Sequence, residues 1–182
     1  MQHLQTYFST VRPGPTWDVA STLSPIYSRG QANRIDDIVA RSMAAGAEVL
    51  CGGQCYETER GIYFKSTLLS GCSPSNAAVQ EEIFGPILTV ERFSGDLEEG
   101  IALVNCTRFG LAAAVHTTNL TLAVHAARSI QAGTVWVNSY GPTPEMNAPL
   151  GGYKQSGYGK DLGTDALYKY FKTKHVWIDT TH

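Results

Sequence analysis

Residues 110–138 read GLAAAVHTTNLTLAVHAARSIQAGTVWVN, and this stretch decides the fold. It begins with a run of small and branched residues that is typical of a strand. Asn119 can then cap a helix, and Gly133 can end it. A second branched run follows at 134–138. A strand, a helix and a strand joined by short connections predict two parallel strands linked by a right-handed crossover, the unit of an α/β fold.

The sequence before this unit continues the alternation of helices and strands. Asp96 and Glu99 have the spacing of a capping box, which marks the start of a helix. Farther upstream, apolar residues three and four positions apart indicate an amphipathic helix that Gly46 can end. The elements expected here are a helix over 29–47, a strand at 48–51, an extended segment at 62–69, a strand at 87–93 and a helix from 96 to 106.

The two ends of the chain have weaker patterns. Residues 1–28 show little periodicity and are expected to be mostly irregular. Beyond the deciding stretch, a loop rich in proline and glycine leads to a helix near 164–171 and a last strand at 172–179. Such a terminal strand either pairs with another chain or domain or forms an edge of its own sheet. The whole pattern predicts an α/β fold with a parallel-strand sheet and flanking helices.

Composition excludes several classes of function. Of the 182 residues, 43% are hydrophobic and 16% are charged, which is typical of a globular chain. The net charge is −2 and the basic residues are scattered, so we expect no nucleic-acid partner. No apolar run reaches the roughly 18 residues of a membrane span, and no export signal is visible, so we expect a cytoplasmic protein without a membrane partner. The four cysteines and five histidines lack metal-ligand spacing, so no metal site is expected.

The glycine cluster at 151–161 does not have the spacing of a phosphate-binding loop. A Walker loop needs a glycine five residues before Gly159, where the chain has Lys154. A dinucleotide fingerprint that starts at Gly157 needs another glycine where the chain has Leu162. We therefore expect no self-contained nucleotide site here.

No catalytic constellation stands out either. The chain has no GxSxG motif. Glu81 and Glu82 could form an acid–base pair, but adjacent residues on extended backbone point to opposite sides, so at most one would face a site.

Three motifs, in order and at the right spacing, resemble those of the aldehyde dehydrogenase superfamily. The agreement extends from about residue 20 to residue 179, and the first twenty residues match weakly. The motifs are Glu81-Glu82-Ile83-Phe84-Gly85-Pro86, Gly133-Thr-Val-Trp-Val-Asn138, and Gly151-Gly152-Tyr-Lys-Gln-Ser-Gly157-x-Gly159 with Leu162-Gly163 behind it.

The resemblance implies a reaction in which a cysteine thiolate attacks an aldehyde and hydride passes to a nicotinamide ring. Water activated by a glutamate then releases the carboxylate. In the family this cysteine, this glutamate and the dinucleotide-binding fold lie upstream of the region matched here, so we assign no catalytic residue in this chain. Gly53-Gln54-Cys55 echoes the family's Gly-Gln-x-Cys pattern but lacks the intervening residue, and we interpret it as a coincidence.

The resemblance also implies binding roles for particular residues. Glu82 matches the glutamate that accepts hydrogen bonds from the nicotinamide ribose, and Phe84 matches the aromatic residue beside the nicotinamide ring. The loop from residue 138 to residue 150 matches the wall of the substrate tunnel and includes Tyr140, Glu145 and Leu150. The family usually has a ring where this chain has Leu150, so a wider or differently shaped tunnel is expected.

These observations lead to one expectation and one alternative. We expect a C-terminal part of an NAD(P)-dependent aldehyde dehydrogenase, with residues 1–155 as a partial catalytic domain and 156–182 as a crossing segment and oligomerisation strand. The complete enzyme would use NAD or NADP, take an aldehyde and form a homo-oligomer. This chain alone would be inactive and hold no cofactor. The alternative is a non-catalytic remnant that acts as a binding or oligomerisation module.

Overall fold

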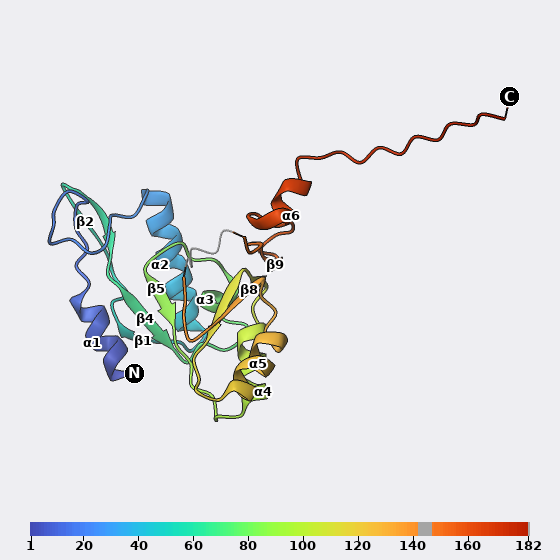
Figure 1. Cartoon of the computed structure of the whole chain (residues 1–182). Coiled ribbons are helices and arrows are strands. Elements are labelled where there is room, and N and C mark those ends of the chain that lie inside the picture. The colour runs from blue at the N-terminus through green and yellow to red at the C-terminus, as the bar shows by residue number, and fades with distance from the viewer. Residues whose placement is uncertain (142–146, 182) are drawn as a thin grey trace. The chain divides into compact units, whose positions relative to one another are not determined.

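A computed structural model describes residues 1–141 and 147–181 (Figure 1). The chain divides into two compact units, Met1–Ser94 and Gly95–His182. Each unit combines helices with paired strands, and each contains a parallel strand pair. The α/β class predicted from the sequence is therefore confirmed.

The first unit is a small sheet with a separate hairpin. Strand β4 lies at the centre of the sheet, antiparallel to β1 and parallel to β5, whereas β2 and β3 pair only with each other. The elements follow the order α1 (Gln2–Thr10), α2 (Arg29–Ala44), β1 (Glu48–Cys51), β2 (Cys55–Thr58), β3 (Gly61–Phe64), β4 (Thr67–Ser70), α3 (Ala77–Gln80) and β5 (Ile87–Thr89).

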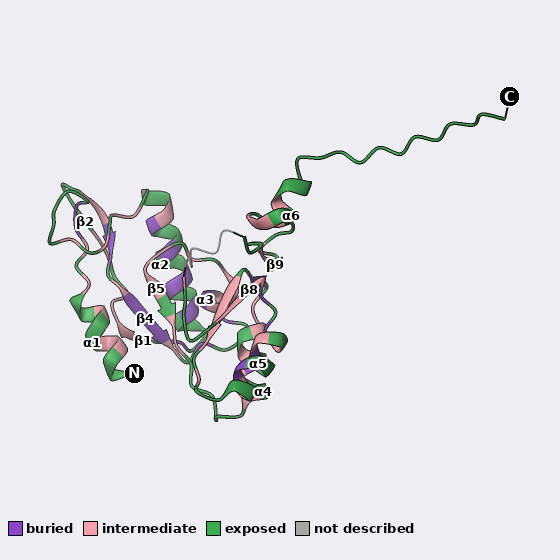
Figure 2. Ribbon diagram, viewed as in Figure 1, coloured by how far each residue is buried: buried purple, intermediate pink, exposed green. Residues whose placement is uncertain are grey.

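Helix α2 is the main support of this unit, and the sequence defines both of its ends. The Ser28 hydroxyl accepts a hydrogen bond from the Gln31 backbone N–H at the start. Gly46, with φ of 98°, turns the chain after the helix, a conformation that glycine adopts without strain. The buried face of α2 includes Ile35 and Ile38, both fully buried (Figure 2). This helix therefore forms one side of the core against which the sheet packs.

The second unit contains the crossover that the sequence predicted. Strands β7 and β8 are parallel, in register from Ala112 opposite Thr134 to Val115 opposite Val137. Helix α5 connects them, and the Asn119 side chain caps it by accepting from the Leu122 N–H. The elements are α4 (Leu97–Asn105), β6 (Phe109–Gly110), β7 (Ala112–Val115), α5 (Leu120–Ser129), β8 (Thr134–Val137), β9 (Tyr153–Lys154) and α6 (Gly163–Tyr168).

The structure corrects three expectations about the fold. Most of the region 1–28 is irregular as expected, but α1 forms within it, and its Gln5 amide donates to the Leu50 carbonyl. The segment at 62–69 is extended as expected, but it divides into two strands, since β3 pairs with β2 and β4 with β1. The last strand is absent: residues 171–181 are exposed and unpaired in this structure, because a strand forms only where a partner completes its ladder.

Within the described ranges, no helix has both the length and the hydropathy needed to cross a membrane.

Candidate functional site

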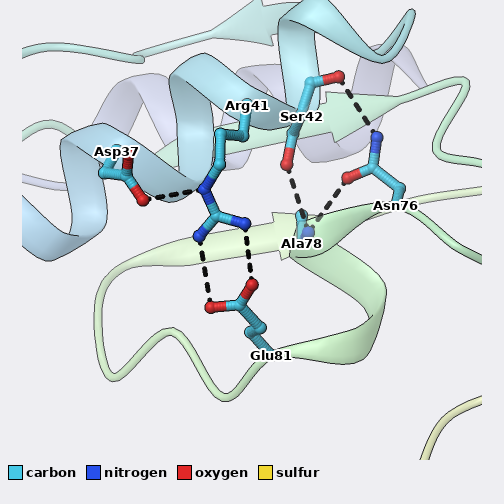
Figure 3. A network of polar contacts seen from close by, with 6 residues as sticks. All are labelled: Asp37, Arg41, Ser42, Asn76, Ala78 and Glu81. Atoms are coloured by element: carbon cyan, nitrogen blue, oxygen red, sulfur yellow. Dashed lines mark hydrogen bonds and ion pairs between the residues drawn. The ribbon is translucent and has the colours of Figure 1, made fainter.

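The two adjacent glutamates have different surroundings. Glu81 has extended backbone, and its carboxylate accepts two hydrogen bonds from the Arg41 guanidinium, at 2.8 and 3.2 Å (Figure 3). Asp37 accepts a third from the same guanidinium at 2.8 Å. These carboxylates, Glu81 first, hold the pKa of Arg41 above its ordinary value. Glu82, in contrast, is exposed and has no ion-pair or hydrogen-bond partner among the described residues.

A buried polar cluster fixes the segment that leads into this pair. Asn76 is 2% exposed, and its side chain accepts from the Ala78 N–H at 2.9 Å while it donates to the Ser42 carbonyl at 3.1 Å. The Ser42 hydroxyl also accepts from the Ala78 N–H, at 3.1 Å. Helix α3 is therefore held against α2 immediately before Glu81 (Figure 3).

The loop after Glu82 is also held by α2. The Gln31 amide donates to the Ile83 carbonyl at 2.8 Å and to the Phe84 carbonyl at 3.0 Å. Arg34, one turn along the helix, donates to the same Ile83 carbonyl at 3.2 Å. The Pro86 carbonyl accepts from the Thr67 N–H at 2.9 Å, which joins the end of the loop to β4. The loop is thus fixed at both ends.

Phe84 presents its ring to the outside of this fixed loop. Its side chain is 73% exposed, and its φ of 52° is a conformation that non-glycine residues seldom adopt. The residue borders a largely apolar groove of about 490 Å³, also lined by Leu23, Pro25, Tyr27, Gln31 and Pro86. A carboxylate, an exposed ring and an apolar groove on one unit can bind a ligand that carries both hydroxyl groups and a flat ring.

The expected tunnel residues lie in the second unit. The Tyr140 ring is 72% exposed and meets Trp136 edge-to-face, with ring centroids 5.0 Å apart. Leu150 is 40% exposed, and its backbone forms a two-way bridge with Asp161. Glu145 lies outside the described residues. The structure thus brings Tyr140 together with Trp136, and the assignment of Tyr140, Glu145 and Leu150 to a tunnel wall stays a prediction.

The glycine cluster has a structural explanation. A β-carbon on Gly133 would lie 1.6 Å from the Gly151 carbonyl oxygen, and one on Gly151 would lie 2.3 Å from the Gly159 oxygen. The Lys160 ammonium donates to the Gly151 carbonyl at 2.7 Å. Lys154 donates to two carbonyls at the end of α4, where a cation is favourable. These residues allow three backbone segments to pack closely.

Cys55 has the environment of a structural thiol. It begins β2 opposite Phe64 and packs against the core that includes Ile35. Burial, with a smaller contribution from the charge of Asp36, raises the pKa of the thiol. A raised pKa disfavours the thiolate that a nucleophile requires. No group of three metal-ligating side chains is found within the part of the chain that the structure describes.

Sequence reasoning missed the residues that support the loop: Gln31, Arg34 and Arg41. All three lie on α2, and their partners in the segment from Glu81 to Phe84 are 40 to 53 residues away in the chain. The available signal was the polar pair Gln31 and Arg34, three residues apart beside the apolar stripe of the helix.

Comparison with known proteins gives a family match over nearly the whole chain. The model of the aldehyde dehydrogenase family matches residues 1–176, so the first twenty residues belong to the matched region as well. Betaine aldehyde dehydrogenases of Brucella ovis and Brucella canis are each 36% identical over 172 residues, which is 93% of this chain and 35% of each relative. The chain thus spans about a third of the length of these curated relatives.

Solved structures give the same result. A point mutant of betaine aldehyde dehydrogenase from Staphylococcus aureus, in the apo form, is 33% identical with a TM-score of 0.89, covering 100% of this chain and 36% of that one. Betaine aldehyde dehydrogenase from the same organism in complex with NAD+ is 33% identical with a TM-score of 0.88, covering 96% of this chain and 35% of that one.

Proposed function

This chain belongs to the aldehyde dehydrogenase family, and on that premise we propose that it supplies the C-terminal part of the catalytic domain of an enzyme that oxidises an aldehyde to a carboxylate with NAD or NADP. Residues 1–155 are part of the catalytic domain, and residues 156–182 form the segment that crosses to the cofactor domain and a neighbouring subunit. The assembled enzyme is a homo-oligomer in the cytoplasm.

The observation that carries this proposal is the free carboxylate of Glu82 on a fixed loop. Glu82 accepts hydrogen bonds from the ribose hydroxyls next to the nicotinamide, and the charge strengthens each bond. Phe84, with its exposed ring, packs beside the nicotinamide. When bound, the cofactor accepts the hydride. A solved relative with NAD+ supports this choice of ligand.

The contribution of this chain is to bind and orient, and the 182 residues alone do not turn over aldehyde. Cys55 is not the nucleophile in this proposal, because it packs against the core and partial burial raises the pKa of its thiol. The isolated chain also binds NAD weakly. One charge-assisted contact contributes about 1.5–3 kcal/mol, which is less than the ~4 kcal/mol of millimolar binding.

The substrate is an aldehyde with a cationic or polar tail. The curated relatives are betaine aldehyde dehydrogenases, and betaine aldehyde carries a quaternary ammonium group. In this proposal Tyr140, Glu145 and Leu150 line the tunnel. The paired rings of Trp136 and Tyr140 offer faces that attract cations.

The exposed segment 171–181 supports the alternative, a non-catalytic binding or oligomerisation module. The enzyme is favoured because the family match also covers the loop around Glu82, which an assembly module does not need.

A chimera tests the proposal. These residues replace the matching segment of the Brucella ovis enzyme, and NAD-dependent oxidation of betaine aldehyde is measured. Glu82→Gln should raise KM for NAD about tenfold, a cost near 1.4 kcal/mol, with little change in KM for the aldehyde. Glu59→Gln, an exposed carboxylate in the turn between β2 and β3, is the matched control and should change neither. An unchanged KM for NAD in Glu82→Gln would reject the cofactor contact.

A further inference from the structure

The segment from Glu81 to Phe84 runs beside α2 and is hydrogen-bonded to it at both ends. Glu81 is bound to Arg41 near the end of the helix, whereas Ile83 and Phe84 are bound to Gln31 near its start, and Arg34 also donates to the Ile83 carbonyl. We propose that Arg41 and Gln31 are positioning residues that hold Glu82 in the orientation needed to bind the cofactor. This inference rests on the function proposed above.

The first of these two contacts, between Arg41 and Glu81, is planar and bidentate. Two nitrogens of Arg41 donate to the two oxygens of Glu81, and the third nitrogen donates to Asp37. A bidentate pair fixes both the position and the rotation of the carboxylate, which a single contact does not. The guanidinium is itself held by Asp37, one turn earlier on α2. The side chain of Glu81 is therefore immobilised against the helix.

The second contact, made by Gln31, holds the backbone of the loop. One amide group of Gln31 donates to two consecutive carbonyls, at 2.8 and 3.0 Å, which fixes the peptide between Ile83 and Phe84. The close approach of Gly85 to the helix strengthens this contact. A β-carbon on Gly85 would lie 2.6 Å from the Ile35 side chain, and Ile35 is fully buried.

Glu82 lies between these two contacts. On extended backbone its side chain points away from the side that Glu81 faces, so the contact that draws Glu81 to the helix directs Glu82 outward. No described residue holds the Glu82 carboxylate itself. Its orientation thus depends on the backbone on either side, which Arg41 and Gln31 fix.

The test uses the chimera with Arg41→Lys, which keeps the charge but loses the bidentate contact, and Gln31→Met, which keeps the length but loses both donors. Each should raise KM for NAD about tenfold, since small misplacements of a binding group are costly. KM for the aldehyde and the melting temperature should stay nearly constant. Arg29→Lys is the matched control and should change nothing, because Arg29 lies on the same helix but pairs with Glu57 of β2 and not with the loop.

Combination with Glu82→Gln separates positioning from a general structural role. If Arg41 and Gln31 act through Glu82, then either change made in the Glu82→Gln background should add little to KM for NAD. Fully additive effects, or equal losses for NAD and aldehyde, would overturn the inference. If Glu82→Gln has no effect by itself, the proposed function fails. If it has an effect but Arg41→Lys and Gln31→Met do not, only the positioning role fails.

A measurement on the chain alone keeps the inference testable without activity. Amide hydrogen exchange of residues 82–85 should be faster in Arg41→Lys and Gln31→Met, while exchange in β4 stays slow. Unchanged exchange in the loop would show that the two contacts do not hold it, and would overturn the proposal.

Discussion

At the scale of single residues, Phe84 combines an unfavourable backbone with an exposed side chain. The left-handed conformation costs a non-glycine residue roughly 1–2 kcal/mol, and a ring that is 73% exposed recovers little of this by burial. Strained residues of this kind occur where the surrounding structure holds them and a ligand uses them. The two hydrogen bonds from Gln31 are the surrounding support.

This strain predicts that substitution of Phe84 by glycine destabilises the chain less than substitution by alanine. Phe84→Gly should be more stable than Phe84→Ala by about 0.5–1 kcal/mol, because glycine relieves the backbone but adds some entropy to the unfolded chain. In the chimera, both should raise KM for NAD, since both remove the ring. Urea unfolding of the chain and steady-state kinetics of the chimera measure the two effects. A less stable Phe84→Gly would show that the backbone is not strained.

The thiols of Cys55, which is partly buried, and Cys72, which is buried, should respond to pH in a defined direction. Burial first, then a neighbouring carboxylate, raises the pKa of Cys55 and of Cys72. Both should therefore react with iodoacetamide at pH 7 more slowly than a peptide thiol, and their rates should still be rising with pH above the ordinary thiol pKa of about 8.5, where the rate of a peptide thiol levels off. The unfolded chain loses these protons first, so stability falls as pH rises through that value.

Mass spectrometry of alkylated peptides follows each thiol, and alkylation in guanidinium is the control, where all cysteines should react alike. Rapid modification of Cys55 at pH 7 would indicate an activated thiolate and would revive Gly53-Gln54-Cys55 as an active-site motif.

At the scale of elements, local patterns predicted what local interactions determine. Helix α2 has a capping serine, an apolar stripe and a terminal glycine. In the β7–α5–β8 crossover, a strand with branched residues lies on either side of a capped helix. Helix α1 was missed because it is short, has no side-chain cap and buries no residue fully. The break between β3 and β4 was missed because it depends on which distant strand each one joins.

Prediction of the candidate site from the sequence was limited in the same way. The motif around Glu82 could be identified from the sequence, because the residues are contiguous. The support from Arg41 and Gln31 could not, since it joins positions brought together only by the fold. The adjacent glutamates are an intermediate case: the sequence predicted that they diverge, and the structure shows that Glu81 is the one that α2 binds.

The glycine cluster should be intolerant of a single methyl group. Gly151→Ala would place a β-carbon 2.3 Å from the Gly159 carbonyl oxygen, and backbone cannot move as a flexible side chain can. We expect a loss of about 3 kcal/mol or more in the second unit. Gly30→Ala is the control: it is exposed in the first turn of α2, where an added β-carbon would meet only the Ser28 hydroxyl, at an ordinary 3.9 Å. This variant should be more stable by about 0.5–1 kcal/mol. Equal stability of the two variants in urea would contradict the close-packing explanation.

At the scale of the whole molecule, the two units have different cores. In the first unit, large side chains such as Ile35, Phe64 and Leu69 are at most 1% exposed. In the second, the buried residues are mainly alanines, together with Ile101 and Ile130 at 8%. The second unit therefore gains less from hydrophobic burial. It also carries the exposed segment 171–181, in which Val176, Trp177 and Ile178 are 64–83% exposed.

This exposed apolar segment predicts self-association. Patches of this kind seek partners, and an unpaired extended segment can add to the edge of a sheet. Light scattering of the chain should show a concentration-dependent oligomer, and removal of residues 172–182 should reduce it. Replacement of Lys172 and Lys174 by glutamine is the control, which keeps the apolar residues and should preserve association. A clean monomer at high concentration would contradict the prediction.

The same exposed segment should allow assembly to be followed by the protein's own tryptophan fluorescence. Two tryptophans of the chain, Trp17 and Trp177, are 74% and 83% exposed, so their indole rings emit into water. Only Trp177 lies on the segment that would be covered when copies assemble. In a Trp17→Phe, Trp136→Phe background, the emission of Trp177 should shift to the blue as concentration rises, because a buried indole is shielded from solvent relaxation. Assembly could then be followed in real time, without an attached dye, from the wavelength of the protein's tryptophan emission.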